Sequence, residues 1–220
     1  MRKQNANYYA VGNRCALLLN ELEALLRELE ILSADNPQKN RAHLLKVLIQ
    51  EEGFHRIETD PVREARDCLG ASFNARALLA EAPEKFNCSS LMAYVYGRCG
   101  IRLPRYALSQ FLRDPGVSVD FAPIFPGDLI FTGGPTEYWI HNDEQHIGHV
   151  GIATENRTII HAVPGQGVIE ESLNDFFAGR DFSGKRRIIP REGGLLILEA
   201  PPENEADCSE AYLLKIFGRS

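Results

Sequence analysis

The sequence has no long apolar run, since no stretch approaches the ~18 consecutive apolar residues of a membrane-spanning helix. Residues 1–14 begin with basic side chains but contain no apolar central segment and no clear cleavage site, so they make a poor signal peptide. We therefore expect no membrane span and a cytoplasmic location. Export by a non-classical route is left open.

The sequence also lacks paired cysteines. None of its five cysteines forms a C-x-x-C motif, and they are Cys15, Cys68, Cys88, Cys99 and Cys208. Their odd number and wide scatter indicate neither a disulfide framework nor a zinc finger. We expect free thiols, as in a reducing compartment.

An excess of basic charge is absent as well. The chain has 30 acidic and 24 basic side chains, and the resulting net charge of −6 argues against a general affinity for nucleic-acid phosphates. Its 44% apolar and 25% charged residues are typical of globular proteins and exclude wholesale disorder. A length of 220 residues allows one ample domain, or one domain with a small appendage.

Leucines at helical spacing predict a helix over 14–32, and a second apolar pattern predicts another over 38–52. We interpret residues 1–58 as a helical hairpin appendage, either structural or a surface for homodimer formation. A role in gating substrate access is a second interpretation. Residues 59–192 are expected to form the main domain, and 193–220 a C-terminal strand with an acidic, mobile tail.

The main domain is predicted to begin with helices and to continue with strands. Asp60 and Pro61 are typical of the first positions of a helix, and a second helix is expected from Cys88 to Gly100. Short segments rich in β-branched residues follow at 128–132, 148–154, 157–163, 167–170 and 185–190. This order predicts an α+β fold with an antiparallel sheet.

Cys88 is a candidate nucleophile because it stands at the predicted start of a helix. Free amide hydrogens and the positive end of the helix dipole would lower the pKa of its thiol and could bind an oxyanion. A lone cysteine is more often an inert buried residue, so the catalytic interpretation requires a nearby base.

His149 and His161 are the candidate base and its partner. If residues 154–156 form a three-residue hairpin loop with Asn156 in the left-handed conformation, the two histidines face each other directly across the ladder. One imidazole can then act as a base while the other orients it. A two-residue loop would instead place them on opposite faces of the sheet, as unrelated polar residues.

The run FNCSSLMAYVYGRCGIRLPRYALSQ, followed by FPGDLIF, HVGIA and IIHA, resembles NlpC-type peptidases, which are papain-like cysteine endopeptidases of bacterial cell-wall peptides. The resemblance covers roughly residues 61–190. It implies a papain-like α+β fold with a helix-start nucleophile packed on an antiparallel sheet. It also implies that Cys88 is the nucleophile, His149 the general base and His161 the orienting third residue.

The same resemblance implies cleavage of an amide bond in peptidoglycan-derived peptides, typically the γ-D-glutamyl–diaminopimelate bond, without a cofactor. A related amidase or acyltransferase, or a non-catalytic module that binds cell-wall peptides, is an alternative. Asn87 and Ser89 flank the nucleophile, and Phe73 stands where the family commonly has a tyrosine. These three residues, with Trp139 on a loop, are the candidate substrate-binding residues.

Two further patterns have less specific interpretations. A metal cluster could be drawn from His141, Asp143, His146 and His149, but their spacing matches no strong zinc signature, so we expect no metal. The basic run Lys185–Arg187 is expected to be a solvated sheet edge, with binding of substrate carboxylates as the alternative.

Overall fold

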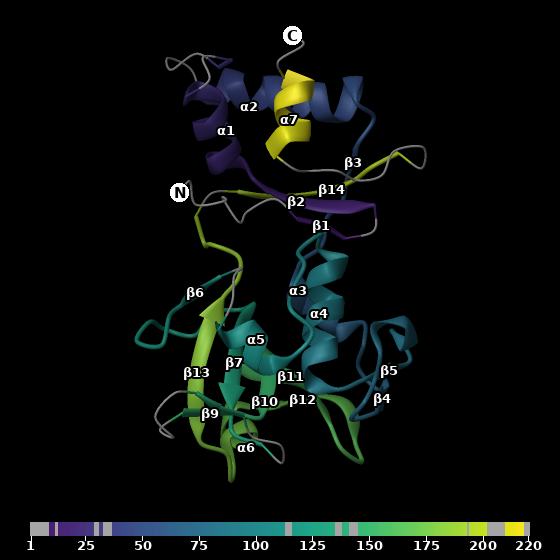
Figure 1. Ribbon diagram of the computed structural model, residues 1–220, viewed down its shortest axis with the longest axis vertical. Coiled ribbons are helices and arrows are strands. Elements are labelled where there is room, and N and C mark those ends of the chain that lie inside the picture. Colours follow the sequence, from purple (N-terminus) through teal and green to yellow (C-terminus); the bar gives the residue numbers. More distant parts are fainter. Residues whose placement is uncertain are drawn as a thin grey trace. The chain divides into compact units, whose positions relative to one another are not determined.

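The structure is a computed structural model that describes residues 9–11, 13–28, 31–32, 37–112, 116–134, 138–140, 145–192, 194–201 and 210–217. The chain divides into two compact units (Figure 1). Unit 1 comprises Met1–Thr59, Arg98–Arg102 and Arg191–Ser220, and unit 2 comprises Asp60–Gly97 and Leu103–Pro190. The C-terminal segment therefore belongs to the same unit as the N-terminal residues.

Unit 1 is a small sheet with helices. Its strands are β1 (Tyr9–Val11), β2 (Arg14–Leu18), β3 (His55–Arg56) and β14 (Leu195–Glu199). They form an antiparallel sheet in the order β1-β2-β14-β3. Its helices are α1 (Leu19–Glu28), α2 (Pro37–Leu45), the π-helical turn η1 (Lys46–Glu51) and α7 (Glu210–Phe217).

The helix expected over 14–32 is wrong in its first turn, because Arg14–Leu18 form strand β2. Leu17 pairs with Leu196 and Cys15 with Leu198, so a partner strand far along the chain fixes this apolar segment as a strand. A short apolar run fits either periodicity by itself, and pairing decides between them. The structure thus corrects the hairpin appendage to a mixed unit that includes β14 and α7.

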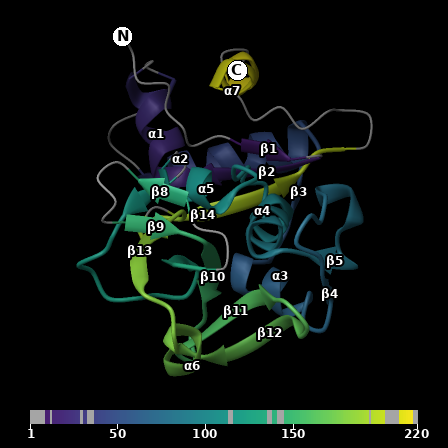
Figure 2. The same cartoon turned by 60° about the horizontal axis from the view of Figure 1, so that its bottom comes forward.

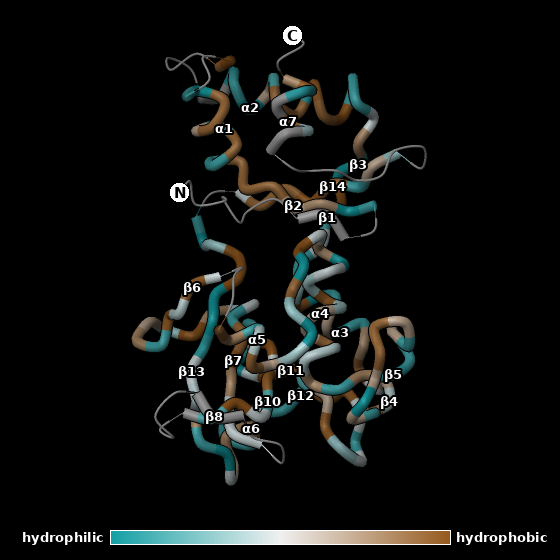
Figure 3. Tube along the Cα trace, viewed as in Figure 1, coloured by the Kyte–Doolittle hydropathy of each residue, from teal (hydrophilic) through white to brown (hydrophobic). Residues whose placement is uncertain are grey.

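Unit 1 has its own apolar core, visible as the hydrophobic stretches of β2, β14 and α7 in Figure 3. Leu22 and Leu26 of α1 are fully buried in this core, together with Leu213 and Phe217 of α7. The leucine face of α1 is therefore covered within its own unit. Residues 202–209 of the expected acidic tail lie outside the described residues, whereas Glu210–Phe217 are helical.

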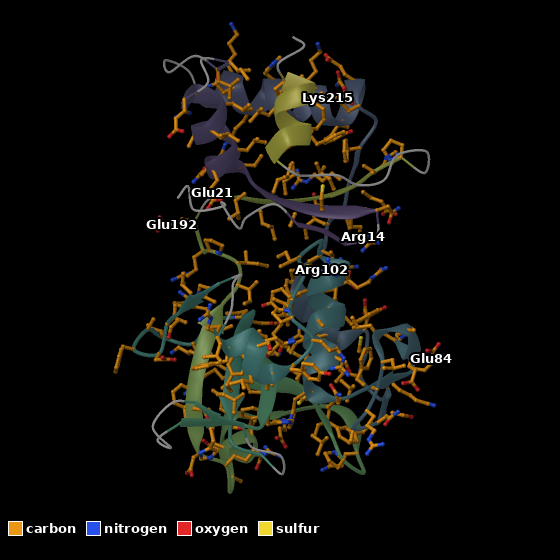
Figure 4. The ribbon with its side chains drawn as sticks, in the orientation of Figure 1. Arg14, Glu21, Glu84, Arg102, Glu192 and Lys215 are labelled. Carbon is orange, nitrogen blue, oxygen red and sulfur yellow. The ribbon has the colours of Figure 1, made fainter. Side chains whose placement is uncertain are left out.

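Two further details concern strand β2. Arg14, labelled in Figure 4, pairs across the ladder with Glu199, and its Nε lies 3.5 Å from Glu199 Oε2. Cys15 is disulfide-bonded, whereas Cys68, Cys88 and Cys99 are free thiols. The expectation that all thiols are free is therefore wrong for Cys15, and the scattered cysteine positions gave no local signal for this bond.

Unit 2 packs helices against a larger sheet. Its helices are α3 (Pro61–Arg66), the 3-10 turn η2 (Leu79–Glu81), α4 (Cys88–Arg98, whose last residue is in unit 1), α5 (Ala107–Leu112) and α6 (Leu173–Phe177). The large sheet contains β6 (Val117–Ser118), β7 (Asp128–Thr132), β10 (His149–Ala153), β11 (Thr158–Val163), β12 (Gly167–Ser172) and β13 (Phe182–Arg187). Two small pairs add β4 (Ser72–Phe73) with β5 (Lys85–Phe86), and β8 (Tyr138–Ile140) with β9 (Gln145–Ile147).

The large sheet is antiparallel, in the order β12-β11-β10-β7-β13-β6. Strands β11 and β12 run side by side toward the front of Figure 2. This arrangement confirms the predicted α+β class and four of the five predicted strand segments. The segment predicted over 185–190 is shifted, since β13 begins three residues earlier and ends at Arg187. The start of α3 is also confirmed, since the side chain of Asp60 accepts hydrogen bonds from the amides of Val62 and Arg63.

The solvated edge expected for residues 185–187 is wrong. Lys185 is only 4% exposed, and its ammonium group donates to the carbonyl oxygen of Ala122. Arg187 forms two hydrogen bonds of 2.8 Å with the carboxylate of Asp128. The three cations of this run are thus held by carbonyl and carboxylate oxygens of the segment 116–128.

In the described part of the chain, no helix is long and apolar enough to span a membrane.

Candidate active site

Cys88 is the first residue of helix α4, as the sequence predicts, and Asn87 caps this helix. Asn87 Oδ1 accepts a 2.8 Å hydrogen bond from the amide of Ser90, and the hydroxyl of Ser90 accepts one of 2.9 Å from the amide of Asn87. Two polar side chains therefore satisfy backbone groups at this helix end and fix the position of Cys88.

The surroundings of the Cys88 thiol favour its neutral form. The thiol is half-buried, and this burial raises its pKa above the ordinary value. Hydrogen bonds from the backbone amides of Val150 and Ser89, and the charge of Arg105, act in the opposite direction but do not prevail. The expected low pKa is therefore wrong, because desolvation outweighs the effect of the helix start.

The amide of Val150 also locates the thiol beside strand β10. Val150 follows His149 directly in the chain, so a hydrogen bond from its amide to Cys88 places the thiol next to the first residues of this strand. The predicted nucleophile and the predicted base thus come from helix α4 and strand β10 to the same place.

His149 and His161 share a face of the sheet, with His149 Nε2 2.7 Å from His161 Nδ1. They are not directly opposite each other, however. Ile152 pairs with Ile160 and Ala153 with Ile159, so the loop is one residue later than expected. Arg157, with φ of 60°, takes the left-handed position expected for Asn156.

The corrected register makes the two histidines diagonal neighbours, and continuing it places Gly151 opposite His161. A Cβ atom at Gly151 would lie 3.2 Å from the Cβ of His161 and 2.3 Å from Cγ2 of Ile159. The absence of a side chain at Gly151 therefore leaves the space through which the two imidazoles meet.

Both imidazoles are kept neutral by burial. His149 is 7% exposed and His161 is fully buried, and both rings contact the buried ring of Phe176. Burial, with the nearby charge of Arg180, lowers the pKa of His149 to about 4. Burial, with His149 and Arg180 nearby, lowers the pKa of His161 to about 3. At neutral pH the site therefore holds a thiol and two uncharged imidazoles.

Glu171 and Arg180 extend this arrangement beyond the residues that the sequence pattern singles out. Glu171 Oε1 lies 2.8 Å from His161 Nε2, and Arg180 Nη1 lies 3.5 Å from the same oxygen. The strand pairing could have indicated Glu171, because it faces Ile159 in the ladder and therefore shares a face with His161. The contact with Arg180 could not be predicted in this way, because Arg180 lies in the turn after α6 and outside any regular sequence pattern.

The candidate substrate-binding residues are placed differently from one another. The amide of Asn87 is engaged in capping and in a 3.0 Å hydrogen bond to the carbonyl of Ala75, and Ser89 is only 5% exposed. Phe73 is half-buried in β4, where it pairs with Phe86. Trp139 belongs to β8 by its backbone, and its side chain lies outside the described part.

Arg105 is a further residue beside the nucleophile. Its Nη1 lies 3.3 Å from both Asn87 Oδ1 and Ser89 Oγ, and its Nη2 donates to the carbonyl of Ala77. Asn87 and Ser89 thus hold the start of the helix and the guanidinium group of Arg105. The positive charge of Arg105 is thereby fixed next to Cys88.

The residues proposed for a metal cluster are only partly described. His141 and Asp143 lie outside the described residues, and His146 lies in β9. Within the described ranges, no three His, Cys, Asp or Glu side chains gather as metal ligands would.

The model of the NlpC/P60 family matches residues 77–187, which is just over half of the chain and contains Cys88, His149 and His161. The chain therefore belongs to the NlpC/P60 family. This membership confirms the resemblance noted in the sequence, and the helix-start cysteine beside an antiparallel sheet confirms the expected papain-like α+β fold.

The chain is similar to several proteins with related names. It is 30% identical to a probable endopeptidase NlpC homolog of Haemophilus influenzae, over 47% of this chain and 49% of that protein. It is 28% identical to a probable endopeptidase p60 of Listeria welshimeri, over 58% of this chain and 21% of that protein. The matched region thus spans half or less of these curated relatives.

Solved structures of the same family are also similar. NlpC2 from Trichomonas vaginalis is 26% identical, covers 60% of this chain and 48% of its own, and superposes with a TM-score of 0.46. An NlpC/P60 family protein from Bacillus cereus is 24% identical, covers 60% of this chain and 40% of its own, and gives a TM-score of 0.49.

Proposed function

We propose that this protein is a cysteine peptidase that hydrolyses an amide bond in peptidoglycan-derived peptides. The observation that carries the proposal is the 2.7 Å contact between the buried imidazoles of His149 and His161, next to the strand residue whose amide binds the Cys88 thiol. Membership of the NlpC/P60 family and the endopeptidase names of the relatives support a peptidase, and the resemblance noted in the sequence supports the peptidoglycan-derived substrate.

The reaction begins from a neutral thiol. His149 takes the proton of Cys88 as the sulfur attacks the substrate carbonyl, and the carbon–sulfur bond forms while the carbonyl oxygen becomes an oxyanion. Amides at the start of α4 stabilise that oxyanion. The protonated His149 then gives its proton to the leaving amine as the carbon–nitrogen bond breaks. Water, deprotonated by His149, hydrolyses the thioester and regenerates the thiol.

The finer proposal is that the scissile bond is the γ-D-glutamyl–diaminopimelate bond, which makes the protein a D,L-endopeptidase. The acyl part of this substrate would carry the free α-carboxylate of D-glutamate. Arg105 beside Cys88 is a cation of suitable sign for that carboxylate.

Incubation of the full chain with defined muropeptides, followed by mass spectrometry of the products, tests both the peptidase activity and the D,L specificity. We expect two fragments whose masses correspond to cleavage between D-glutamate and diaminopimelate, and no products from Cys88→Ala. Cleavage of another amide bond would retain the peptidase and reject the D,L specificity. Acyl transfer to an added amine would indicate an acyltransferase, and binding without products would reject the enzymatic proposal.

A further inference from the structure

A carboxylate, two imidazoles and the strands that hold them form a continuous line across the sheet. His149 lies on β10, His161 on β11 and Glu171 on β12, and all three side chains are on one face. The contacts along the line are 2.7 Å from His149 Nε2 to His161 Nδ1 and 2.8 Å from His161 Nε2 to Glu171 Oε1. Each step joins diagonal neighbours of adjacent strands.

The contact between His161 and Glu171 is close but not yet aligned as a hydrogen bond. Both atoms are buried, and within the described residues neither has another hydrogen-bond partner. The terminal torsion of a glutamate side chain is broad, so a small rotation aligns the carboxylate with the ring N–H. A hydrogen bond between these two buried atoms is favoured, because a buried polar atom without a hydrogen bond costs free energy.

The direction of hydrogen bonding along this line follows from the end group. A carboxylate only accepts hydrogen bonds, so His161 must carry its single proton on Nε2. Nδ1 of His161 is then an acceptor, and Nε2 of His149 must carry the proton that it donates. In neutral His149, the remaining nitrogen with a lone pair is Nδ1.

We propose that Glu171 is a positioning residue that sets the tautomers of both histidines and thereby leaves Nδ1 of His149 as the basic nitrogen. This inference deepens the proposed function, since it rests on His149 as the base for Cys88. Without the carboxylate, His161 can carry its proton on Nδ1 and donate to His149, whose proton then moves to Nδ1. In that tautomer His149 cannot accept the thiol proton.

Glu170 provides a matched control on the same strand. It is the neighbouring glutamate, but its side chain is on the opposite face, where the hydroxyl of Thr158 donates to it and Thr154 Oγ1 lies 3.4 Å away. Glu170→Gln therefore makes the same chemical change in β12 without touching the histidines. Glu171→Gln retains an oxygen that can accept from His161 Nε2, whereas Glu171→Ala does not.

The direct test is long-range ¹H–¹⁵N correlation NMR of the full chain labelled with ¹⁵N-histidine at pH 7. In the wild type we expect both His149 and His161 to carry the proton on Nε2. Glu171→Ala should give mixed tautomers, while Glu171→Gln and Glu170→Gln should keep the wild-type pattern. A proton on Nδ1 of His161 in the wild type, or unchanged tautomers in a folded Glu171→Ala variant, would overturn the inference.

Two kinetic measurements complement the NMR measurement of the tautomers. Glu171→Ala should lower kcat/KM on the muropeptide substrate by about 10²-fold, in the range that a general base contributes, while Glu171→Gln and Glu170→Gln lose much less. Within the described residues, the charged groups at the histidine pair are Glu171 on β12 and Arg180 after α6, and the titratable thiol of Cys88 lies on α4. Removing the negative charge in Glu171→Gln should move the acid limb of the kcat/KM profile to lower pH.

Failure of this inference is separable from failure of the proposed function, because the tautomers are measured without substrate. A protein that keeps the expected tautomers but cleaves no muropeptide would reject the substrate and retain the role of Glu171. Active protein whose tautomers are unchanged in Glu171→Ala and whose acid limb is unchanged in Glu171→Gln would retain the function and reject the role of Glu171.

Discussion

Gly151 lies opposite His161 and makes room for His149, two residues before it on strand β10, to form its 2.7 Å contact with His161. An added methyl group would meet Cγ2 of Ile159 at 2.3 Å, and this atom is close to the backbone of a β-branched residue that cannot easily turn away. A glycine inside a strand is costly in conformational entropy, so its presence here has a packing reason.

Gly151→Ala should therefore lower both stability and activity. We expect a loss of roughly 1–3 kcal/mol in the free energy of unfolding, as for overpacked cores, and a larger loss of kcat/KM because His161 is displaced. Urea denaturation and the muropeptide assay measure the two effects. Ile159→Ala removes the atom that clashes, so the double variant should lose less stability than the sum of the single changes. Additive losses would show that the clash is relieved elsewhere.

The stability of the protein should fall as the pH decreases below about 6.5, because the histidines are buried uncharged. The pKa values are about 4 for His149 and about 3 for His161 in the folded protein, against 6.5 in the unfolded chain. Between these values the unfolded chain binds more protons than the native state, so acid favours unfolding. Urea denaturation from pH 7 to pH 4 gives the slope.

The variant with His149→Gln and His161→Gln is the control for this pH dependence. Carboxylates also contribute to acid unfolding, but they are unchanged in this variant. The slope of its free energy of unfolding against pH, between pH 6.5 and pH 4, should therefore correspond to up to two fewer protons taken up on unfolding than in the wild type. Equal slopes for the two proteins would mean that these histidines titrate normally in the folded state.

Cys88 should react with iodoacetamide faster than the other free thiols that the structure describes, because Cys68 and Cys99 are 4% and 0% exposed. Its raised pKa means that the rate should continue to increase at pH values where an ordinary thiol is already largely ionised. Mass spectrometry at limiting reagent identifies the modified residue. A rate that is constant from pH 6 upward would instead indicate a preformed thiolate.

Much of the site is predictable from local patterns, and the remainder depends on contacts between distant segments. The position of Cys88 follows from the predicted start of its helix, and the shared face of His149 and His161 follows once the hairpin loop has three residues. The shift of the loop to Arg157 does not follow, since asparagine is the more usual left-handed residue. The burial of Lys185 depends on the carbonyl of Ala122, 63 residues earlier, and no periodicity indicates such a contact.

The division into two units changes which truncation should fold. From the sequence, deletion of residues 1–55 would leave a folded domain, but β14 and α7 pack with the deleted residues in unit 1. A chain of residues 56–220 would expose Leu196, Leu198 and Phe217. We expect it to bind a hydrophobic dye and aggregate, whereas residues 60–190 should unfold cooperatively when followed by circular dichroism. Cooperative unfolding of both chains without dye binding would contradict the shared core.

The last prediction separates the two histidines by their contacts. His149→Ala should abolish activity nearly as completely as Cys88→Ala, and the double variant should be little worse, because residues that act as one unit are not additive. In the proposed tautomers, His161 acts on His149 through Nδ1, which lies 2.7 Å from His149 Nε2 and accepts its hydrogen bond, while its Nε2 faces Glu171. The carbonyl oxygen of an amide can accept the same hydrogen bond, so His161→Asn or His161→Gln should retain a substantial part of kcat/KM, whereas His161→Ala should lose considerably more. An inactive His161→Asn together with an active His149→Ala would require the roles of the two residues to be exchanged.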